Sequence, residues 1–415
     1  MHACCRSSCP GEGFGGPAAS PEGGHAVFDH RLDPELEELQ RTVAGFARAV
    51  IAPVIGGFYE RQEFPYDLVR RLGELGIFGI PFPEKYGGMG GDTFAFAVVL
   101  EEIARVDTSV AITLEASVSL GAMSIYRFGT DAQREQWLPQ LCRGETLAAF
   151  ALTEPDGGSD AAALRTRAHR DGDAWVLNGS KAFITNSGTA ITGPVLVAAR
   201  APAIGDAHGI SIILVPAGTD GFTVGKAYSK VGWAASDTHE LAFADCRVPA
   251  ENLIGTEGQG YAQFLEVLDE GRIAIAAVCS GLARGCVDEA SRYARERLAF
   301  GHAIGEFQAI QFKLADMEAR AHGARLAYLH AASVAAKGEP FKKDAALAKL
   351  IASDAAMANA REAAQIFGGS GFMTESPVGR FYRDAKALEI GEGTSEILRL
   401  VIARTMGLEA VLDVR

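Results

Sequence analysis

The sequence predicts an α+β protein in which a helical segment, a β-rich segment and a second helical segment follow one another. The first observation is that hydrophobic residues recur with helical spacing over about 33–148 and again over about 258–410. The second is that the stretch between them, 149–257, holds short β-rich runs separated by turn residues. This α, β, α order excludes a Rossmann domain and a (β/α)₈ barrel, because both need alternating strands and helices.

Composition and charge exclude several classes of protein. Hydrophobic residues make up 48% of the 415 residues, enough for a large core, so global disorder is excluded. A formal net charge of −13 argues against a nucleic-acid partner, because phosphate contacts need clustered Lys and Arg. No stretch of the sequence reaches eighteen apolar residues without a charged residue in it, so we expect no membrane-spanning helix and no membrane partner. The seven scattered cysteines are interpreted as reduced thiols.

Residues 1–32 are predicted to form a flexible tail rich in Gly, Pro and Ser. A formal GxGxxG at 11–16 is interpreted as a chance match, because no strand precedes it and Pro17 follows. The tail has no apolar core of a secretion signal and too few arginines for a transit peptide, which favours a cytoplasmic location over the mitochondrial matrix. No metal site is expected, because no standard zinc spacing is formed by His2, Cys4, Cys5 and Cys9.

The first helical segment, 33–148, opens with an amphipathic helix. One face carries apolar residues at steps of three and four, namely Leu36, Leu39, Val43, Phe46 and Val50. Pro53 is expected to end this helix and Pro139 a later one. Further helices are predicted from Tyr66 onward and over 94–105, 117–128 and 131–138.

The β segment is predicted to be antiparallel, because its connections are too short for βαβ crossovers. Strands are expected at 175–177, 194–199 and 210–215, with another that ends at Pro249. The last segment, 258–410, has helical patterns long enough for a bundle, over 259–297, 307–337, 342–366 and 394–406.

Three ordered motifs resemble the acyl-CoA dehydrogenase family over roughly residues 33–410. They are ALTEPDGGSD at 151–160, NGSKAFITN at 178–186, and QIFGGSGF at 365–372 followed by RDAK at 383–386 and IGEGTSEI at 390–397. The resemblance implies an N-terminal helical domain, a middle antiparallel β-barrel-like domain and a C-terminal four-helix bundle. It also implies FAD as cofactor and a homotetramer built as a dimer of dimers.

The first two motifs place hydroxyl groups, glycines and an aromatic ring where a ligand can approach the backbone, although alone they also fit an ordinary turn and a core strand. The resemblance implies that FAD contacts Phe150, Leu152, Thr153, Gly158, Ser159, Phe183, Ile184 and Thr185. Arg297 offers a guanidinium fork suited to a diphosphate, or else is a solvated arginine at a helix end. The resemblance implies further FAD contacts, in part to the FAD of a neighbouring subunit, from Arg297, Phe300, Gln308, Gln365, Gly368, Gly369, Thr394 and Glu396.

Glu392 stands between two glycines just before a predicted helix. By itself it fits a charge that interacts with the helix dipole. The resemblance implies instead that it is the catalytic base, since Gly271, where some branched-chain members carry their glutamate, has no carboxyl group. Asp269 and Arg272 by themselves fit an intrahelical pair. The resemblance implies a substrate site formed by Ser159, Asp269, Arg272, Gly393 and Arg404.

The function implied is FAD-dependent oxidation of an acyl-CoA thioester to the trans-2-enoyl-CoA. Glu392 would remove the α-proton while the β-hydrogen leaves as hydride to flavin N5, and the electrons would pass to an electron-transferring flavoprotein. One alternative is an acyl-CoA oxidase that uses O₂, which is usually a longer protein. Another, of a different class, is a non-catalytic scaffold that binds acyl-CoA or flavin. The sequence does not fix the length or branching of the acyl group.

Overall fold

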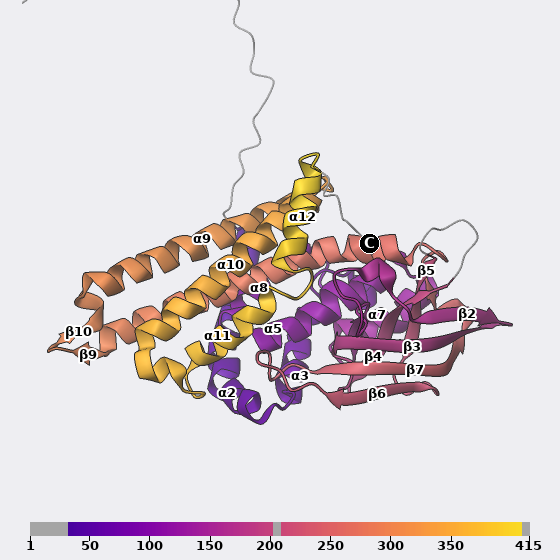
Figure 1. Cartoon of the computed structure of the whole chain (residues 1–415), viewed down its shortest axis with the longest axis horizontal. Coiled ribbons are helices and arrows are strands. Elements are labelled where there is room, and N and C mark those ends of the chain that lie inside the picture. Colours follow the sequence, from indigo (N-terminus) through magenta and orange to yellow (C-terminus); the bar gives the residue numbers. More distant parts are fainter. Residues whose placement is uncertain (1–31, 202–208, 409–415) are drawn as a thin grey trace, which may run out of the picture. The chain divides into compact units, whose positions relative to one another are not determined.

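The computed structural model describes residues 32–201 and 209–408, and the predicted tail therefore lies almost entirely outside them. The first part of the described chain is helical, as predicted (Figure 1). Its α-helices are α1 (Pro34–Phe46), α2 (Ala52–Arg61), α3 (Tyr66–Glu74), α4 (Thr93–Ala104), α5 (Thr108–Glu115), α6 (Met123–Phe128) and α7 (Asp131–Cys142). Two π-helical segments, η1 (Ala47–Ile51) and η4 (Ala116–Ala122), join α1 to α2 and α5 to α6.

Both predicted proline helix ends are wrong. Pro53 lies in the first turn of α2, directly after the π-helical η1, where a missing N–H costs little. Pro139 lies inside α7, which continues to Cys142 because Leu138, Leu141 and Cys142 are buried and stabilise its last turn by packing. Helix α5 was not predicted.

Two helical stretches are long and apolar enough to cross a membrane by length and composition, Pro34–Arg61 and Thr108–Phe128. The second is completely buried within the protein, as a core helix is, and α1 packs one face against α4. The burial of the second stretch explains why its sequence is so apolar.

The middle part forms an eight-stranded sheet in the order β6-β7-β3-β2-β4-β5-β8, with β1 beside β4. The strands are β1 (Leu147–Ala151), β2 (Arg167–Asp171), β3 (Ala174–Thr185), β4 (Thr192–Arg200), β5 (Ile210–Pro216), β6 (Phe222–Ala227), β7 (Thr238–Pro249) and β8 (Leu253–Ile254). The predicted antiparallel pairing is correct for most neighbours but wrong for β1 with β4 and for β2 with β4, which pair in parallel. Strand β1 follows α7 and was not predicted.

Strands β4 and β5 are buried on both faces. Along β4, Val195 and Val197 join the core of the sheet, whereas Leu196 and Ala198 pack into the core of the helices. This alternation with period two therefore joins the sheet to the helical core.

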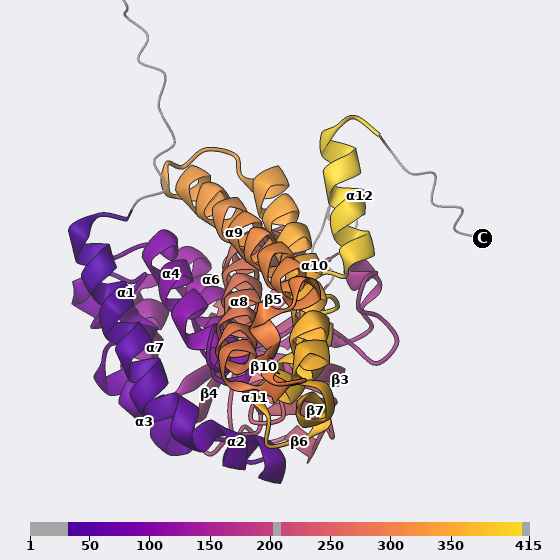
Figure 2. The same ribbon diagram turned by 90° about the vertical axis from the view of Figure 1, so that its left-hand side faces the viewer.

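The last part is a helical bundle, and α9 and α10 lie alongside α8 (Figures 1 and 2). Its elements are α8 (Gly260–Glu296), a short hairpin of β9 (Leu298–Ala299) and β10 (His302–Ala303), α9 (Gln308–Ala336), α10 (Lys342–Phe367), α11 (Pro377–Leu388) and α12 (Ser395–Thr405). Helix α11 was not predicted. Gly281 lets α4 approach α8 closely, because a Cβ there would clash with the Glu101 carbonyl oxygen.

One buried carboxylate links the three parts. Asp384 of α11 accepts hydrogen bonds from Tyr59 Oη, Thr108 Oγ1 and the Trp233 backbone N–H, each at 2.6 Å. Because these donors come from α2, α5 and the loop before β7, Asp384 fixes all three against the bundle. The domain boundaries at 148 and 257 remain a prediction.

Candidate active site

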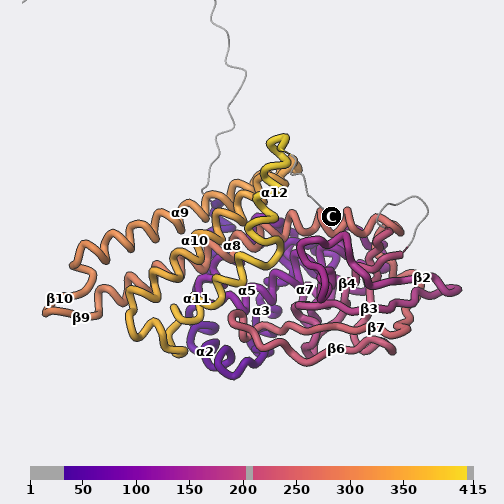
Figure 3. Tube along the Cα trace, in the orientation of Figure 1, coloured from indigo at the N-terminus to yellow at the C-terminus, as the bar shows by residue number. Residues whose placement is uncertain are grey.

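Glu392 lies in a tight loop between α11 and α12, which the tube in Figure 3 follows. The backbone is left-handed at Glu392 (φ +53°) and at Gly393 (φ +101°). Lys349, wholly buried on α10, donates a hydrogen bond from Nζ to the Gly393 carbonyl oxygen at 2.8 Å. Thr394 caps α12 by accepting a hydrogen bond from the Ile397 N–H. The base loop, Gly391–Gly393, is therefore held from both sides.

The Glu392 side chain turns inward toward α8 rather than outward into solvent. A Cβ atom at Gly271 would lie 2.5 Å from Glu392 Oε2, so the absence of a side chain at 271 makes the room that this carboxyl group occupies. Burial raises the pKa of Glu392, while a hydrogen bond with Glu115 and the positive charges of Lys349 and Arg272 act to lower it. A carboxyl group with a raised pKa is suited to take up a proton near neutral pH.

Asp269 and Arg272, which were predicted to bind substrate, form the intrahelical ion pair on α8 that their spacing also fits. Unlike a surface pair it is largely buried, and the Arg272 Nε has no hydrogen-bond partner within 32–201 and 209–408. Arg272 lies beside the base loop, since its Nε would be 3.9 Å from a Cβ on Gly393. A buried guanidinium with a spare donor next to Glu392 is suited to bind a polar group of a ligand.

The TEPDGGSD loop is fixed to β3 by a buried ion pair. Glu154 accepts hydrogen bonds from Lys181 Nζ at 2.8 Å and from the Thr166 N–H at 2.9 Å. Lys181 Nζ also donates to the Leu152 carbonyl oxygen. These contacts leave Thr153 half-buried and Gly158 and Ser159 exposed, so the loop presents its hydroxyl groups and backbone outward.

Phe183 and Thr185 stand near this loop on the end of β3. The Phe183 side chain is 64% exposed, its φ is +61°, and its ring lies 5.0 Å from that of Tyr228. A large flat ring held outward is the kind of surface on which another flat ring packs. Ile184 points the other way into the sheet core, so only its backbone is open to a ligand. Phe150 is half-buried and packs edge-on against Phe264.

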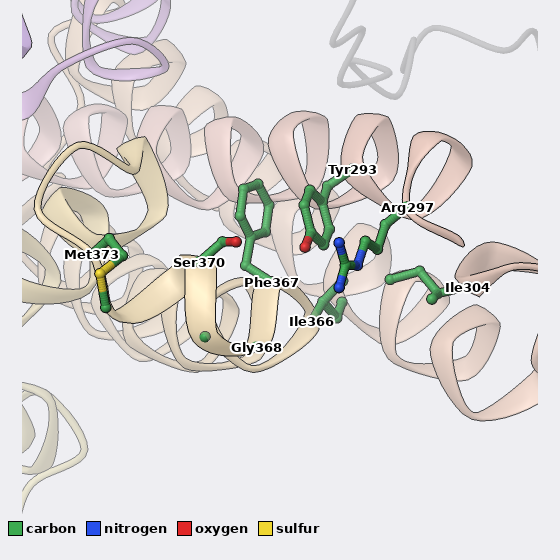
Figure 4. Close-up of a pocket in the computed structure, with 9 residues that line it drawn as sticks. Tyr293, Arg297, Ile304, Ile366, Phe367, Gly368, Ser370 and Met373 are labelled. Atoms are coloured by element: carbon green, nitrogen blue, oxygen red, sulfur yellow. The ribbon is translucent and has the colours of Figure 1, made fainter. Parts of the chain in front are cut away.

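A hollow with a volume of about 600 Å³ lies at the end of the bundle near the β9–β10 hairpin (Figure 4). Tyr293 and Phe367 stack there with their ring centres 4.1 Å apart, and Arg297 projects beside them. Gly368 and Gly369 line the same hollow, and a Cβ on either would meet nothing within 4 Å. This bundle-end pocket therefore combines an arginine with an open, unobstructed backbone.

The other residues predicted for this half of the cofactor site are exposed. Phe300, on the β9–β10 turn, is 95% exposed, and Gln308 and Gln365 are also exposed. The pocket is remote from Glu392. Lys349 and Gly368 are 19 residues apart along α10, roughly 28 Å at the rise of an α-helix.

The remaining predicted residues lie on α12. Glu396 is exposed in its first turn, and Arg404 is exposed in its last turn. Most of the predicted site residues thus lie in a base site around Glu392, in a rim on the β domain, or in and around the bundle-end pocket, whereas Glu396 and Arg404 are exposed along α12.

Two buried residues of the base site were not predicted. Glu115 ends α5 and Lys349 lies on α10, and both contribute to the electrostatics of Glu392. The sequence around each of these two residues holds a feature that could have pointed to it. Glu115 is the only acidic residue between Asp107 and Asp131, and Lys349 is one lone basic residue in an Ala-rich run.

Comparisons with known proteins agree with this geometry. Models of the N-terminal, middle and C-terminal domains of acyl-CoA dehydrogenase match residues 33–145, 149–246 and 258–407. The chain belongs to the acyl-CoA dehydrogenase family. The predicted fold class and the predicted enzyme class are thereby confirmed, and members of this family depend on FAD.

Individual relatives are similar over nearly their whole length. The Bacillus subtilis protein "Probable acyl-CoA dehydrogenase YngJ" is 46% identical over 91% of this chain and 100% of its own. The mitochondrial short-chain specific acyl-CoA dehydrogenase of Rattus norvegicus is 43% identical over 91% of this chain and 92% of its own. The structure of butyryl-CoA dehydrogenase from Megasphaera elsdenii superposes with a TM-score of 0.88 at 41% identity, covering 92% of this chain and 100% of that one.

Within the described residues, no group of three His, Cys, Asp or Glu side chains is arranged to hold a metal ion. Cys142, Cys246, Cys279 and Cys286 are buried free thiols. The tail residues His2, Cys4, Cys5 and Cys9 lie outside the described part of the chain.

Proposed function

We propose that this member of the family oxidises short acyl-CoA thioesters, with Glu392 as the base that removes the α-proton. The observation that carries the proposal is the inward carboxyl group of Glu392, seated in the space left by Gly271. The 40–43% identity to relatives named as short-chain specific or butyryl-CoA dehydrogenases supports the substrate class.

The reaction needs few protein groups, but each of them must be placed accurately against the substrate. The Cα–H bond beside a thioester is only weakly acidic, so the carboxylate must lie close to that hydrogen and the enolate must be stabilised as it forms. Glu392 takes the proton and becomes a neutral carboxylic acid, a form that its buried surroundings favour. The backbone N–H of Glu392, fixed by the base loop, is the group we assign to the thioester oxygen. Asp269, Arg272 and Gly393, with Ser159 and Arg404, are assigned to substrate binding.

The rim on the β domain fits the isoalloxazine end of FAD. It offers an exposed aromatic ring at Phe183, hydroxyl groups at Thr153, Ser159 and Thr185, and the open backbone of Gly158. When bound, the flavin supplies a hydride acceptor for the β-hydrogen. The role of the chain is to hold the ring against Phe183 and to keep water from the acidic Cα–H bond.

The bundle-end pocket fits the diphosphate end of FAD, with Arg297 as the fork for phosphate oxygens and Gly368 and Gly369 for close approach of the backbone. Phe300, Gln308 and Gln365 are assigned to the same half, and Thr394 and Glu396 to further cofactor contacts. Because this pocket lies roughly 28 Å along α10 from the base site, we propose that it serves the FAD of a second copy. The exposed Phe300 and Phe372 beside it are suited to be covered by that copy.

We propose that the enzyme is a homotetramer and passes its electrons to an electron-transferring flavoprotein. An oxidase remains the enzymatic alternative, and it would pass them to O₂ instead. Production of hydrogen peroxide during aerobic turnover would support the oxidase.

The test is anaerobic mixing of the purified yellow protein with acyl-CoA thioesters from short to long, straight and branched. We expect the flavin absorbance to bleach fastest with short straight chains, and wild-type turnover to need an added electron-transferring flavoprotein. A yellow protein whose colour is unchanged by every thioester would contradict catalysis. A flat profile across the series would contradict the short-chain assignment.

A further inference from the structure

Glu115 is a second carboxyl group that faces the base, and it comes from a part of the chain far from the base loop. It ends α5, at the point where the helix passes into the π-helical η4, and its side chain is wholly buried. Its carboxyl group lies within hydrogen-bonding reach of the Glu392 carboxyl group. Leu120 of η4 and Glu392 border the same space beside Gly271.

The position of Glu115 is fixed by hydrogen bonds to its helix on either side. Asn186, just after β3, donates from Nδ2 to the Thr113 carbonyl oxygen at 2.9 Å. Ser117 Oγ accepts a hydrogen bond from the Ala148 N–H of β1 at 3.1 Å. The segment that carries Glu115 is thus tied to the sheet on both sides of this residue.

With both groups ionised, this arrangement leaves buried acceptors without donors. Neither oxygen of Glu115 has a donor anywhere in the described residues, and the same holds for Glu392 Oε2. A buried, unpaired oxygen is costly, and two facing carboxylates repel each other. One proton placed between the two groups removes the repulsion and pairs one oxygen of each group, because it turns the contact into a hydrogen bond.

The surroundings decide which of the two holds that proton. Arg272 and Lys349 approach Glu392 from α8 and α10 and favour its ionised form. Cys279 of α8 also lies near Glu392, and burial raises the pKa of its thiol to about 12, so it carries no charge. Burial and then the charge of Glu392 raise the pKa of Glu115 well above its usual range, and no cation acts to lower it.

We propose that Glu115 is a positioning residue for the base: as a neutral acid it donates a hydrogen bond to the Glu392 carboxylate and keeps that group ionised before substrate arrives. This inference rests on the proposed role of Glu392. When Glu392 accepts the α-proton, the pair holds two protons and the hydrogen bond no longer has an anionic acceptor. Glu115 gains and loses no atoms in the step.

The experiment compares the pH dependence of kcat/KM for the wild-type holoenzyme, Glu115→Gln and Glu115→Leu, with butyryl-CoA as substrate. The activity should rise with pH as the free base ionises. In Glu115→Leu the donor is lost, so the pKa of Glu392 should rise. The acid limb, which is the part of the kcat/KM profile that rises with pH, should then move about one unit to higher pH. In Glu115→Gln the amide still donates, so the limb should stay near that of the wild type.

A shift of both variants to lower pH would overturn the proposal, because it would mean that Glu115 is charged and repels the base. A loss of kcat in both variants with an unmoved limb would also overturn it, since that outcome indicates packing alone. Glu102→Gln is the matched control. Glu102 is a buried carboxyl group on α4 that accepts a hydrogen bond from Gln40, away from the base site, and its loss should leave the limb in place.

A second measurement keeps the proposal testable if Glu115→Leu does not fold. Infrared difference spectra of wild type minus Glu115→Gln at pH 8 should show the C=O band of a neutral carboxylic acid, and only a carboxylate band there would contradict the proposal. Failure of the proposed function would appear differently, as a wild-type flavin that no acyl-CoA bleaches at any pH.

Discussion

The base site and the bundle-end pocket differ in how much of each a single chain completes. Glu392 is enclosed by α5, α8 and α10 of its own chain and has charged groups on several sides. At the bundle end, Arg297 lines an open hollow, and Arg297, Gln308 and Phe300 are all exposed. Under the proposed function, the difference means that one chain prepares proton abstraction by itself, whereas a second copy completes the cofactor site at the bundle end. Changes at the base should act on kcat at any protein concentration, and changes at the pocket should act on FAD retention.

The largest expected effect comes from Glu392→Gln, which removes the base and keeps the shape. Turnover should fall by about 10³-fold or more, in line with the loss of a positioned general base. Steady-state rates with butyryl-CoA measure this, and bound FAD should be unchanged. Retained turnover with full FAD content would remove Glu392 from the mechanism.

Next is Gly271→Ala, which tests whether the empty position at 271 seats the base. The added Cβ would lie 2.5 Å from Glu392 Oε2, so the carboxyl group must move. A displacement of this kind should lower kcat by about 10- to 100-fold. Gly323→Ala on α9 is the control, because a Cβ there meets nothing within 4 Å, and it should leave kcat unchanged. Equal rates for both variants would contradict the seating.

A smaller effect is expected at the pocket. Arg297→Ala should raise the dissociation constant of FAD by about 10-fold, since it removes one charged phosphate contact. The loss should grow as the protein is diluted if, as we propose, a second copy completes the site. Fluorescence of released FAD measures it, with Arg295→Ala, which does not line the pocket, as the control. A loss of kcat without release of FAD would contradict the proposal that Arg297 acts on cofactor binding and not on catalysis.

The smallest effect concerns stability rather than chemistry. Tyr59→Phe removes one hydrogen bond to the buried Asp384 and should lower the free energy of unfolding by about 1–3 kcal/mol. Thermal melting of the holoenzyme measures the change. Tyr382→Phe, at an exposed tyrosine, should change the melting temperature less. Equal shifts would mean that Asp384 does not join the three parts.

The sequence predicts those features of the fold that depend on residues close together in the chain. The long bundle helices and the strand that ends at Pro249 were predicted from the sequence, because each depends on neighbouring residues. The role of Glu392 as base came from the family resemblance and stays a prediction. Pro53 was misread because the π-helical η1 changes which N–H groups need partners. The parallel pairing of β1 with β4 was missed because it joins distant strands. Glu115 was missed for the same reason, since it lies 277 residues before Glu392 and only the fold brings the two together.

The most direct test of the central claim is a crystal structure of the holoenzyme with an acyl-CoA analogue that cannot be oxidised. We predict that a carboxyl oxygen of Glu392 lies within about 3–3.5 Å of carbon two of the acyl group, the distance of a group ready to react. A structure in which Glu392 points into solvent while a different side chain lies against carbon two would contradict the claim.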